Sequence, residues 1–479
     1  MGRHGSVVVR EGRADPCAGA SAPAGVRNGV VDGFPPGRER VLSPNKFFGI
    51  MRFDRVRAGL STGFGPLFEE DEGLSTLLYP YRRAATRAGE IPVGSARASF
   101  RRGERMKARC KRKELLAAFG MVSGVVPSRS PKPILQNVKL VVDPELGTIL
   151  MATDLEVGIR HKVYGVTAYE PGSVILPTNK MQSILSTSAD AELDIETDGD
   201  HLIVRGLYAQ FRLPSEDASL YPEVPDFAAT SYHVVAASDL RKLIRRTMFA
   251  TDVESTRYAL GGVLVELTAD SITMVGTDGR RLAKMSAPAE AENGAQPPAG
   301  SPVIPVKALK LIDRNLDDPE LSVHIAVQSG SAVLIRTSDQ GAVIYSRLVE
   351  GRFPRYQDVF PAEVDVKIPL DVALLRQAVE QASIVTSDES RGVDFRFAGD
   401  TLTLSSQAAD VGSSQVTMPI HYEGKEVDIT FDPRYLTDAL KTIDDNEMIT
   451  AELIDHKNAA VFKTEDRYTY VVMPLTRDR

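Results

Sequence analysis

The sequence predicts an α+β protein in which one domain plan occurs three times. Residues 135–163 and 260–286 share a pattern of strand, acidic turn, strand, Thr-Asp turn and strand, and residues 391–419 repeat it more faintly. The equivalent residues Thr153, Thr277 and Gln407 stand 124 and 130 positions apart. Because similar segments at near-constant spacing mark a repeated structural unit, we expect three domains of similar size.

A second repeated unit follows the first in each predicted domain. Residues 175–186, 303–316 and 429–443 each indicate a strand that leads into an amphipathic helix, followed by strands rich in Val and Ile. Each domain is therefore expected to contain two β-α-β-β-β halves. Prolines near positions 220–225 and 352–361 end the first two domains, which gives expected spans of 106–228, 229–361 and 362–479.

Residues 1–105 are a different kind of sequence. They hold 17 Lys and Arg against 11 Asp and Glu, whereas the rest of the chain holds 40 against 53. No sustained periodicity appears in this segment, so the composition predicts disorder. Ordered-looking sequence begins directly after Met106, which suggests that translation starts there and that residues 1–105 are an over-extended gene prediction. A basic disordered tail is the alternative.

Composition excludes several classes of protein. No run of 18 apolar residues is present, so a membrane-spanning helix is not expected. The two cysteines, Cys17 and Cys110, are too few for a disulfide framework and favour a cytoplasmic setting. The seven histidines are scattered singly, so neither a metal site nor a cofactor is expected.

Two predicted helices carry a cationic face opposite an apolar stripe. In residues 238–249 the stripe begins at Leu240 and Leu243, and Ser238 or Asp239 is a candidate N-cap. The opposite faces of this helix and of the helix at 306–314 present Arg241, Lys242, Arg245, Arg246, Lys307, Lys310 and Arg314. Such faces are commonly no more than solvated surface. Their recurrence in an acidic body instead favours a surface for a polyanion, namely duplex DNA bound without sequence choice.

The stretch "MVGTDGRRLA" at 274–283 allows three interpretations. It could be a phosphate-binding loop, a catalytic carboxylate beside two arginines, or a turn between strands. An enzyme would use Asp154 and Asp278, at equivalent places in two repeats, as a carboxylate pair. The third repeat has Gln407 and Ala408 there instead, and Thr-Asp is a good turn pair, so the turn is favoured.

The body of the chain resembles the bacterial DNA polymerase III beta subunit family, the sliding clamps. The resemblance is carried by "KPILQNVKL", "MATDLE", "TRYALGGVLVEL", "TDGRRLAK", "LVEGRFPRYQDVFP", "SRGV" and the terminal "YTYVVMPLTR", collinear over about 106–477. It implies a DNA-clamp fold in which a head-to-tail homodimer closes a ring, with antiparallel sheets outside and helices lining the hole. It also implies a non-catalytic processivity factor that encircles and slides on duplex DNA and tethers the replicative polymerase.

The resemblance further implies a pocket that receives short peptides from the polymerase, the clamp loader and repair proteins. Its expected residues are Arg257, Leu260, Thr277, Gly279, Arg280, Arg281, Leu282, Pro354, Val359, Tyr435, Val471, Val472, Met473, Pro474 and Leu475. Arg129 and Tyr258 match family positions that touch DNA. Arg280, Asp358 and Ser390 depart from the family's usual residues, which affects the expected peptide preference. A clamp-like scaffold that does not serve replication is the alternative function, because fold alone does not determine function.

Overall fold

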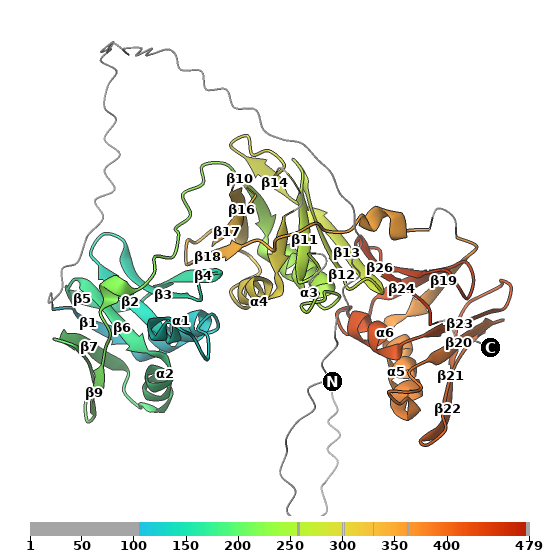
Figure 1. Cartoon of the computed structure of the whole chain (residues 1–479), viewed down its shortest axis with the longest axis horizontal. Helices are drawn as coiled ribbons and strands as arrows, with labels where there is room; N and C mark the ends of the chain where they lie inside the picture. Colours follow the sequence, from blue (N-terminus) through green and yellow to red (C-terminus); the bar gives the residue numbers. More distant parts are fainter. Residues whose placement is uncertain are drawn as a thin grey trace, which may run out of the picture. The chain divides into compact units, whose positions relative to one another are not determined.

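The computed structural model describes residues 105–255, 259–298, 300, 302–328, 330–361 and 364–475. The predictions for residues 1–104, and for Arg257 and Tyr258, fall outside the described residues. Within them, the expected α+β class is confirmed: helices pack on antiparallel sheets, and the β-α-β-β-β half recurs along the chain (Figure 1).

The first domain contains both expected halves and one additional strand. Its first half is β1 (Lys107–Lys111), α1 (Arg112–Ser123), β2 (Asn137–Asp143), β3 (Gly147–Thr153) and β4 (Val157–Val163), with the 3₁₀ turn η1 (Pro133–Gln136) before β2. The second half is β6 (Gly172–Pro177), α2 (Thr178–Thr187), β7 (Glu192–Asp198), β8 (His201–Arg205) and β9 (Gln210–Pro214), and the turn η2 (Ala218–Leu220) follows it. The additional strand, β5 (Val166–Glu170), pairs antiparallel with β1.

The second domain repeats this order, including the additional strand. Its first half is β10 (Tyr232–Ala236), α3 (Ala237–Met248), β11 (Gly262–Leu267), β12 (Ser271–Thr277) and β13 (Arg281–Pro288). Its second half is β15 (Val303–Pro305), α4 (Val306–Arg314), β16 (Ser322–Gln328), β17 (Ala332–Thr337) and β18 (Ala342–Arg347). The short strand β14 (Glu290–Glu292) pairs with β10 as β5 pairs with β1.

The third domain follows the 3₁₀ turn η3 (Tyr356–Val359). Its halves are β19 (Val366–Asp371), α5 (Val372–Ala382), β20 (Val393–Ala398), β21 (Thr401–Ala408) and β22 (Gly412–Pro419), then β23 (Val427–Phe431), α6 (Pro433–Leu440), β24 (Met448–Leu453), β25 (Ala460–Lys463) and β26 (Tyr468–Val472). The turn η4 (Ser383–Val385) extends α5.

Two sheets continue from one domain into the next. The last strand of the second domain, β18, pairs with β4 of the first domain, which makes a nine-stranded sheet. In the same way β26 of the third domain pairs with β13 of the second, which makes an eight-stranded sheet. The strands β9 and β22 occupy the equivalent positions at the two remaining sheets, and among the described strands each of them is an edge. The backbone groups on those edges therefore remain available for pairing.

The helices form where the sequence places an apolar stripe at helical spacing. In α3 the side chains of Leu240, Leu243 and Ile244 are buried, and burying each such side chain stabilises the fold by roughly 1.5–3 kcal/mol. The expected N-cap at Ser238 or Asp239 was wrong, because the helix begins at Ala237 after Ala236, which makes no side-chain cap. Asp239 lies in the first turn instead, where a negative charge favours the helix dipole.

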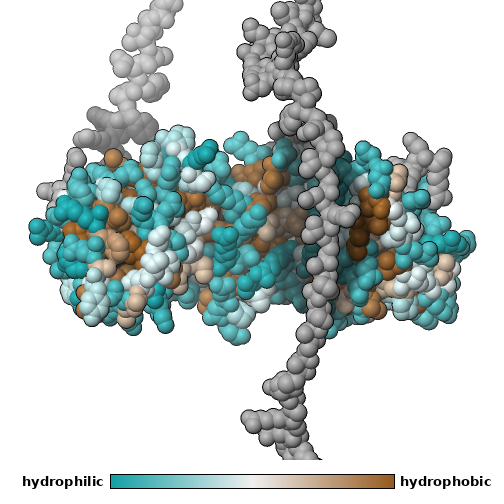
Figure 2. Space-filling model, turned by 90° about the horizontal axis from the view of Figure 1, so that it is seen from below, coloured by the Kyte–Doolittle hydropathy of each residue, from teal (hydrophilic) through white to brown (hydrophobic). Residues whose placement is uncertain are grey.

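The surface drawn in Figure 2 is mainly hydrophilic, with hydrophobic residues in separate patches. The exposed large hydrophobic side chains include Leu207 and Tyr208 in the β8–β9 turn and Ile384 after α5. Among the described residues, none of the helices combines the length and apolar character needed to cross a membrane.

Candidate functional site

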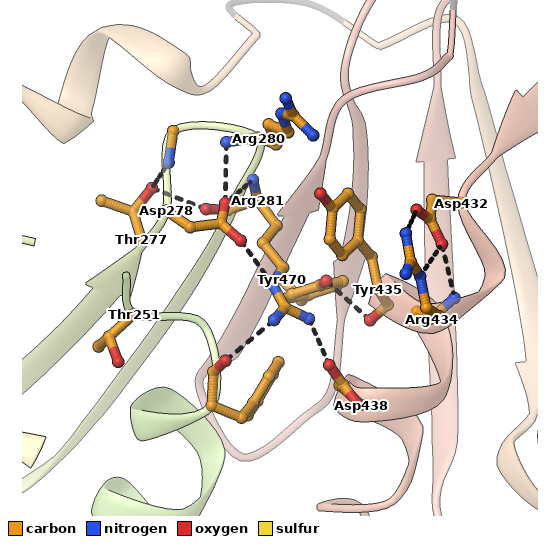
Figure 3. Close-up of polar contacts among 12 residues, drawn as sticks. Thr251, Thr277, Asp278, Arg280, Arg281, Asp432, Arg434, Tyr435, Asp438 and Tyr470 are labelled. Carbon is orange, nitrogen blue, oxygen red and sulfur yellow. Dashed lines mark hydrogen bonds and ion pairs between the residues drawn. The ribbon is translucent and has the colours of Figure 1, made fainter. Parts of the chain in front are cut away.

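The Thr-Asp-Gly turn between β12 and β13 is held together by its own side chains. The Thr277 hydroxyl donates to the Arg281 carbonyl at 2.7 Å and accepts from the Gly279 amide at 3.1 Å (Figure 3). One carboxylate oxygen of Asp278 accepts from the backbone amides of Arg280 and Arg281 at 2.9 and 3.0 Å. Gly279 has a φ of +86°, a conformation that favours glycine.

The equivalent turn of the first domain has the same construction. The Thr153 hydroxyl donates to the Val157 carbonyl at 2.9 Å, and Asp154 accepts from the amides of Glu156 and Val157 at 3.0 and 2.7 Å. Asp154 and Asp278 therefore hold two separate hairpins by satisfying backbone donors. This geometry makes each carboxylate a structural acceptor and gives no support to a catalytic pair.

Both turns are also contacted by the following domain. Lys307, on α4 of the second domain, forms an ion pair with Asp154 of the first. Arg281 contacts Asp278 at 3.0 Å, reaches Asp438 on α6 of the third domain at 2.8 Å, and donates to the Phe249 carbonyl at 3.0 Å (Figure 3). The two Thr-Asp turns thus lie at the two boundaries between domains.

Arg281 is a partly buried cation that joins the second and third domains. Its guanidinium lies 4.7 Å from the ring centroid of Tyr435 and 5.4 Å from that of Phe249. Burial alone would lower the pKa of Arg281, but the hydrogen bond to Asp438 and the nearby negative charges outweigh burial and raise it. The side chain therefore stays charged, and stacking and ion pairing fix it in one place.

A cavity of about 460 Å³ opens beside this turn, where β13 pairs with β26. It is lined by Thr277, Gly279, Arg280, Arg281, Leu282, Pro354, Arg355, Tyr356, Asp358, Val359, Lys457, Asn458, Ala459, Val471 and Met473. Beneath it lies a small apolar core to which Leu264, Phe353 and Val461 belong. An apolar floor with polar groups at the rim suits a pocket for a short peptide with an apolar anchor.

The expected pocket residues divide into those that line this cavity and those that do not. Nine of them line it: Thr277, Gly279, Arg280, Arg281, Leu282, Pro354, Val359, Val471 and Met473. Leu260 is buried in the small core below the cavity, and Val472 is fully buried in the main core. Tyr435 stacks on Arg281, and Pro474 and Leu475 lie beyond the lining. Arg257 is outside the described residues.

The prediction from the sequence did not include several of the residues that line the cavity. Arg355 and Tyr356 belong to the proline-containing stretch that marked the domain end, so their place in the chain was a usable signal. Lys457, Asn458 and Ala459 lie in the β24–β25 connection, where the sequence offers no periodic pattern.

Two backbone amides near the C-terminus, those of Met473 and Leu475, form hydrogen bonds in the same region. The Met473 amide donates to the Arg280 carbonyl at 2.9 Å, and the Leu475 amide donates to the Thr430 carbonyl at 2.8 Å. The Met473 side chain is 42% exposed although its backbone is held. The Met473 side chain therefore lines the cavity while contributing little to the core.

The expected cationic face of α3 requires one correction. Arg246 is 1% exposed and does not lie on an open surface. Its guanidinium contacts Glu447 at 2.7 Å and Asp466 at 2.6 Å, donates to the Thr442 carbonyl at 3.3 Å, and lies 5.4 Å from the Tyr468 ring centroid. The expectation that Arg246 faces DNA was wrong, because the third domain covers this side of the helix.

The other cations of this face differ in how far they are engaged. Lys242 pairs with Asp466 at 3.1 Å. Arg241 and Arg245 both contact Asp313 of α4, at 3.4 and 2.8 Å, and the Arg245 side chain remains 51% exposed. Exposed cations elsewhere on the expected DNA-facing elements are Lys310 and Arg314 on α4 and Arg129 in the loop after α1.

Three domain families match the chain in succession. The DNA polymerase III beta subunit N-terminal, central and C-terminal domains match residues 106–225, 234–355 and 357–476. The Pseudomonas putida beta sliding clamp is 32% identical over 370 residues, which cover 76% of this chain and 98% of that protein. The Vibrio cholerae beta sliding clamp is 29% identical over 374 residues, covering 77% and 100%.

Solved structures agree with these relatives. The Pseudomonas aeruginosa sliding clamp bound to griselimycin has a TM-score of 0.71 and 29% identity, covering 78% of this chain and 100% of that one. The Bacillus subtilis sliding clamp, at 24% identity and a TM-score of 0.72, covers 78% and 99% and supports the fold. The chain therefore belongs to the DNA polymerase III beta subunit family and is a sliding-clamp processivity factor, a non-catalytic subunit of the polymerase holoenzyme.

Proposed function

We propose that two copies of this chain close head to tail into a ring around duplex DNA, and that the ring holds partner peptides in the cavity beside Thr277. The observation that carries this proposal is the repeated joint between domains. Each internal boundary is made by the last strand of one domain pairing with the preceding domain, as β18 pairs with β4 and β26 with β13. The edges β9 and β22 are the strands that would make the same joint between two copies.

The repeat also supplies the register of this third joint. Tyr345 pairs with Gly158 at the first boundary, and Val471 pairs with Leu282 at the second. The equivalent residues on the two edges are Arg212, opposite Ile203 of β8, and Ser413, opposite Gln407 of β21. Arg212 is therefore expected to face Ser413 of the partner subunit in an antiparallel pair.

Apolar side chains at both edges favour burial on association. Phe211 on β9 is 37% exposed, and its neighbour Leu213 packs partly against the core. Ile384, in the η4 turn that packs against β22, is 75% exposed. Removing these side chains from water would stabilise the dimer by about 25 cal/mol per Å² of apolar surface.

A disulfide across the joint tests the ring. The variant Arg212→Cys/Ser413→Cys, in a Cys17→Ser background, should form a covalently closed dimer on oxidation, whereas each single variant should not. Cys110 should not interfere, because it is buried and burial raises the pKa of its thiol to about 12. Once loaded, the oxidised ring should stay on circular DNA and leave linear DNA. Equal retention on both DNAs, or no closed dimer, would contradict the proposal.

DNA would be held by the exposed cations of the helices. Arg245, Lys310 and Arg314, with Arg129 in the first domain, are the candidates for phosphate contacts, and Lys242, Arg241 and Lys307 would contribute charge from within ion pairs. Phosphate contacts carry no sequence information, as a sliding protein requires. Tyr258 stays a family-based candidate for DNA contact.

The cavity beside Thr277 would receive peptides from the replicative polymerase, clamp-loader subunits and repair proteins. The pocket then converts repeated polymerase binding into a tethered event at high effective concentration. We place this activity in the cytoplasm, in keeping with the free, buried thiol of Cys110.

A further inference from the structure

A second cavity adjoins the proposed peptide pocket. It has a volume of about 340 Å³ and is lined by Leu264, Glu266 and residues 351–357. Pro354, Arg355 and Tyr356 line both cavities, so the two cavities lie on either side of these residues. A peptide that crosses these residues would occupy both cavities.

Cations dominate the rims of the two cavities. Arg280, Arg355 and Lys457 line the first, Arg352 and Arg355 line the second, and Lys284 lies over the rings of Tyr356 and Phe360. The acids are Asp358 in the first cavity and Glu266 in the second, where Glu266 accepts a hydrogen bond from the Tyr356 hydroxyl at 2.8 Å. This excess of positive charge occurs in a body, residues 106–479, that holds 53 acidic and 40 basic residues.

Two of these cations are available to a ligand. Arg352 and Arg355 are exposed, and neither forms an ion pair with another residue in the part of the chain that the structure describes. Both flank Phe353 and Pro354, which are held by the small apolar core and the cavity wall. Their backbone is thus fixed, while their guanidinium groups can turn toward a carboxylate.

We propose that partners seated in the pocket carry an acidic flank beside their apolar anchor, and that this flank lies in the second cavity against Arg352 and Arg355. The inference rests on the proposed peptide pocket. Charge complementarity of this kind raises association rates and selects among peptides with similar anchors. An acidic peptide is favoured over a nucleic acid because the cations surround an apolar anchor site.

The test compares matched fluorescent peptides by anisotropy. Each has two leucines and a phenylalanine as its anchor, with four glutamates or four glutamines on the N-terminal or C-terminal side. On the intact protein at low ionic strength, the four-glutamate peptide whose flank lies on the side of the second cavity should bind about fivefold more tightly than the four-glutamine peptide with its flank on the same side. Salt should reduce this difference, because exposed charges are screened.

The variant Arg352→Gln/Arg355→Gln should reduce the preference for the glutamate peptide to below about twofold. Because Arg352 lines only the second cavity, the single variant Arg352→Gln should reduce this preference in part while leaving the glutamine peptide's affinity unchanged. Arg347→Gln/Lys425→Gln removes two exposed cations from other elements and should keep the preference. Equal binding of glutamate and glutamine peptides to the intact protein, or an equal loss in the control variant, would overturn the inference. If no peptide binds, the proposed pocket itself fails and the acidic flank with it.

A labelled oligothymidylate tests the alternative ligand of this surface, a nucleic acid. It should bind equally to the intact protein and to Arg352→Gln/Arg355→Gln. If its affinity falls as far as that of the glutamate peptide, the surface is a nucleic-acid site and the acidic-peptide inference is overturned.

Discussion

Two neighbouring arginines of α3 should behave in opposite ways when each is replaced by alanine. Arg246 is 1% exposed, and its partners Glu447 and Asp466 are 26% and 32% exposed. Breaking a buried ion pair on one side costs about 3–5 kcal/mol, and partial solvation of the two acids reduces this to about 2–3 kcal/mol for Arg246→Ala. Arg245 is 51% exposed beside Asp313, so Arg245→Ala should cost less than about 1 kcal/mol.

Urea denaturation followed by circular dichroism measures this difference. With a slope of roughly 2 kcal/mol per molar urea, Arg246→Ala should lower the unfolding midpoint by about 1 M, while Arg245→Ala should leave it nearly unchanged. For DNA binding the ranking of the two variants should reverse. At a temperature where both variants are folded, Arg245→Ala should lose more salt-sensitive DNA affinity than Arg246→Ala. Equal midpoints for the two variants would refute the assignment of Arg246 as a buried cation that, like Arg281, joins the second and third domains.

Four further outcomes are expected. Burial raises the pKa of Asp466, but hydrogen bonds from its neighbours and nearby cations outweigh burial and lower it; its stabilising effect should be present above the unfolded-state pKa and lost as the pH falls, and Asp466→Asn should flatten the acid limb of a pH–stability curve. Met473→Ala should abolish binding of an anchor peptide in an anisotropy assay with the melting temperature unchanged. Gly279→Ala should lower the free energy of unfolding in urea by about 1 kcal/mol because of the positive φ alone, since the added Cβ meets nothing within 4 Å. Lys310→Glu/Arg314→Glu should weaken retention on DNA in a salt-dependent way. Unchanged retention at low salt would contradict this last expectation.

Sequence periodicity was sufficient to predict the helices and strands that pack one face against a core. The helix expected at 306–314 has those bounds in the structure, because Leu309 and Ile312 repeat at helical spacing. The strands β5 and β14 were missed because they are short and their residues are mostly exposed. Their pairing with β1 and β10 is decided by the neighbouring strand and not by their own residues.

The site was predictable only in part, for two physical reasons. A helical wheel shows which side of α3 avoids its own core, but it cannot show that the third domain covers Arg246. The assignment of Val472 to the pocket overlooked strand alternation: Val471 and Met473 line the cavity, whereas Val472 points to the opposite face. The positions of Lys457 and its neighbours depend on tertiary contact alone.

The Thr-Asp turn has a consequence for which boundaries can come apart. At both boundaries within the chain a turn aspartate, Asp154 or Asp278, is paired with a cation, whereas the third copy has Ala408 at the equivalent position and its turn carboxylate, Asp410, lies two residues later. In the proposed ring that third copy lies at the joint between subunits. Each of the two joints within the chain therefore has an ion pair that involves a turn aspartate. In the proposed ring, the joint between subunits, which would open to admit DNA, is the one whose turn lacks an aspartate at that position.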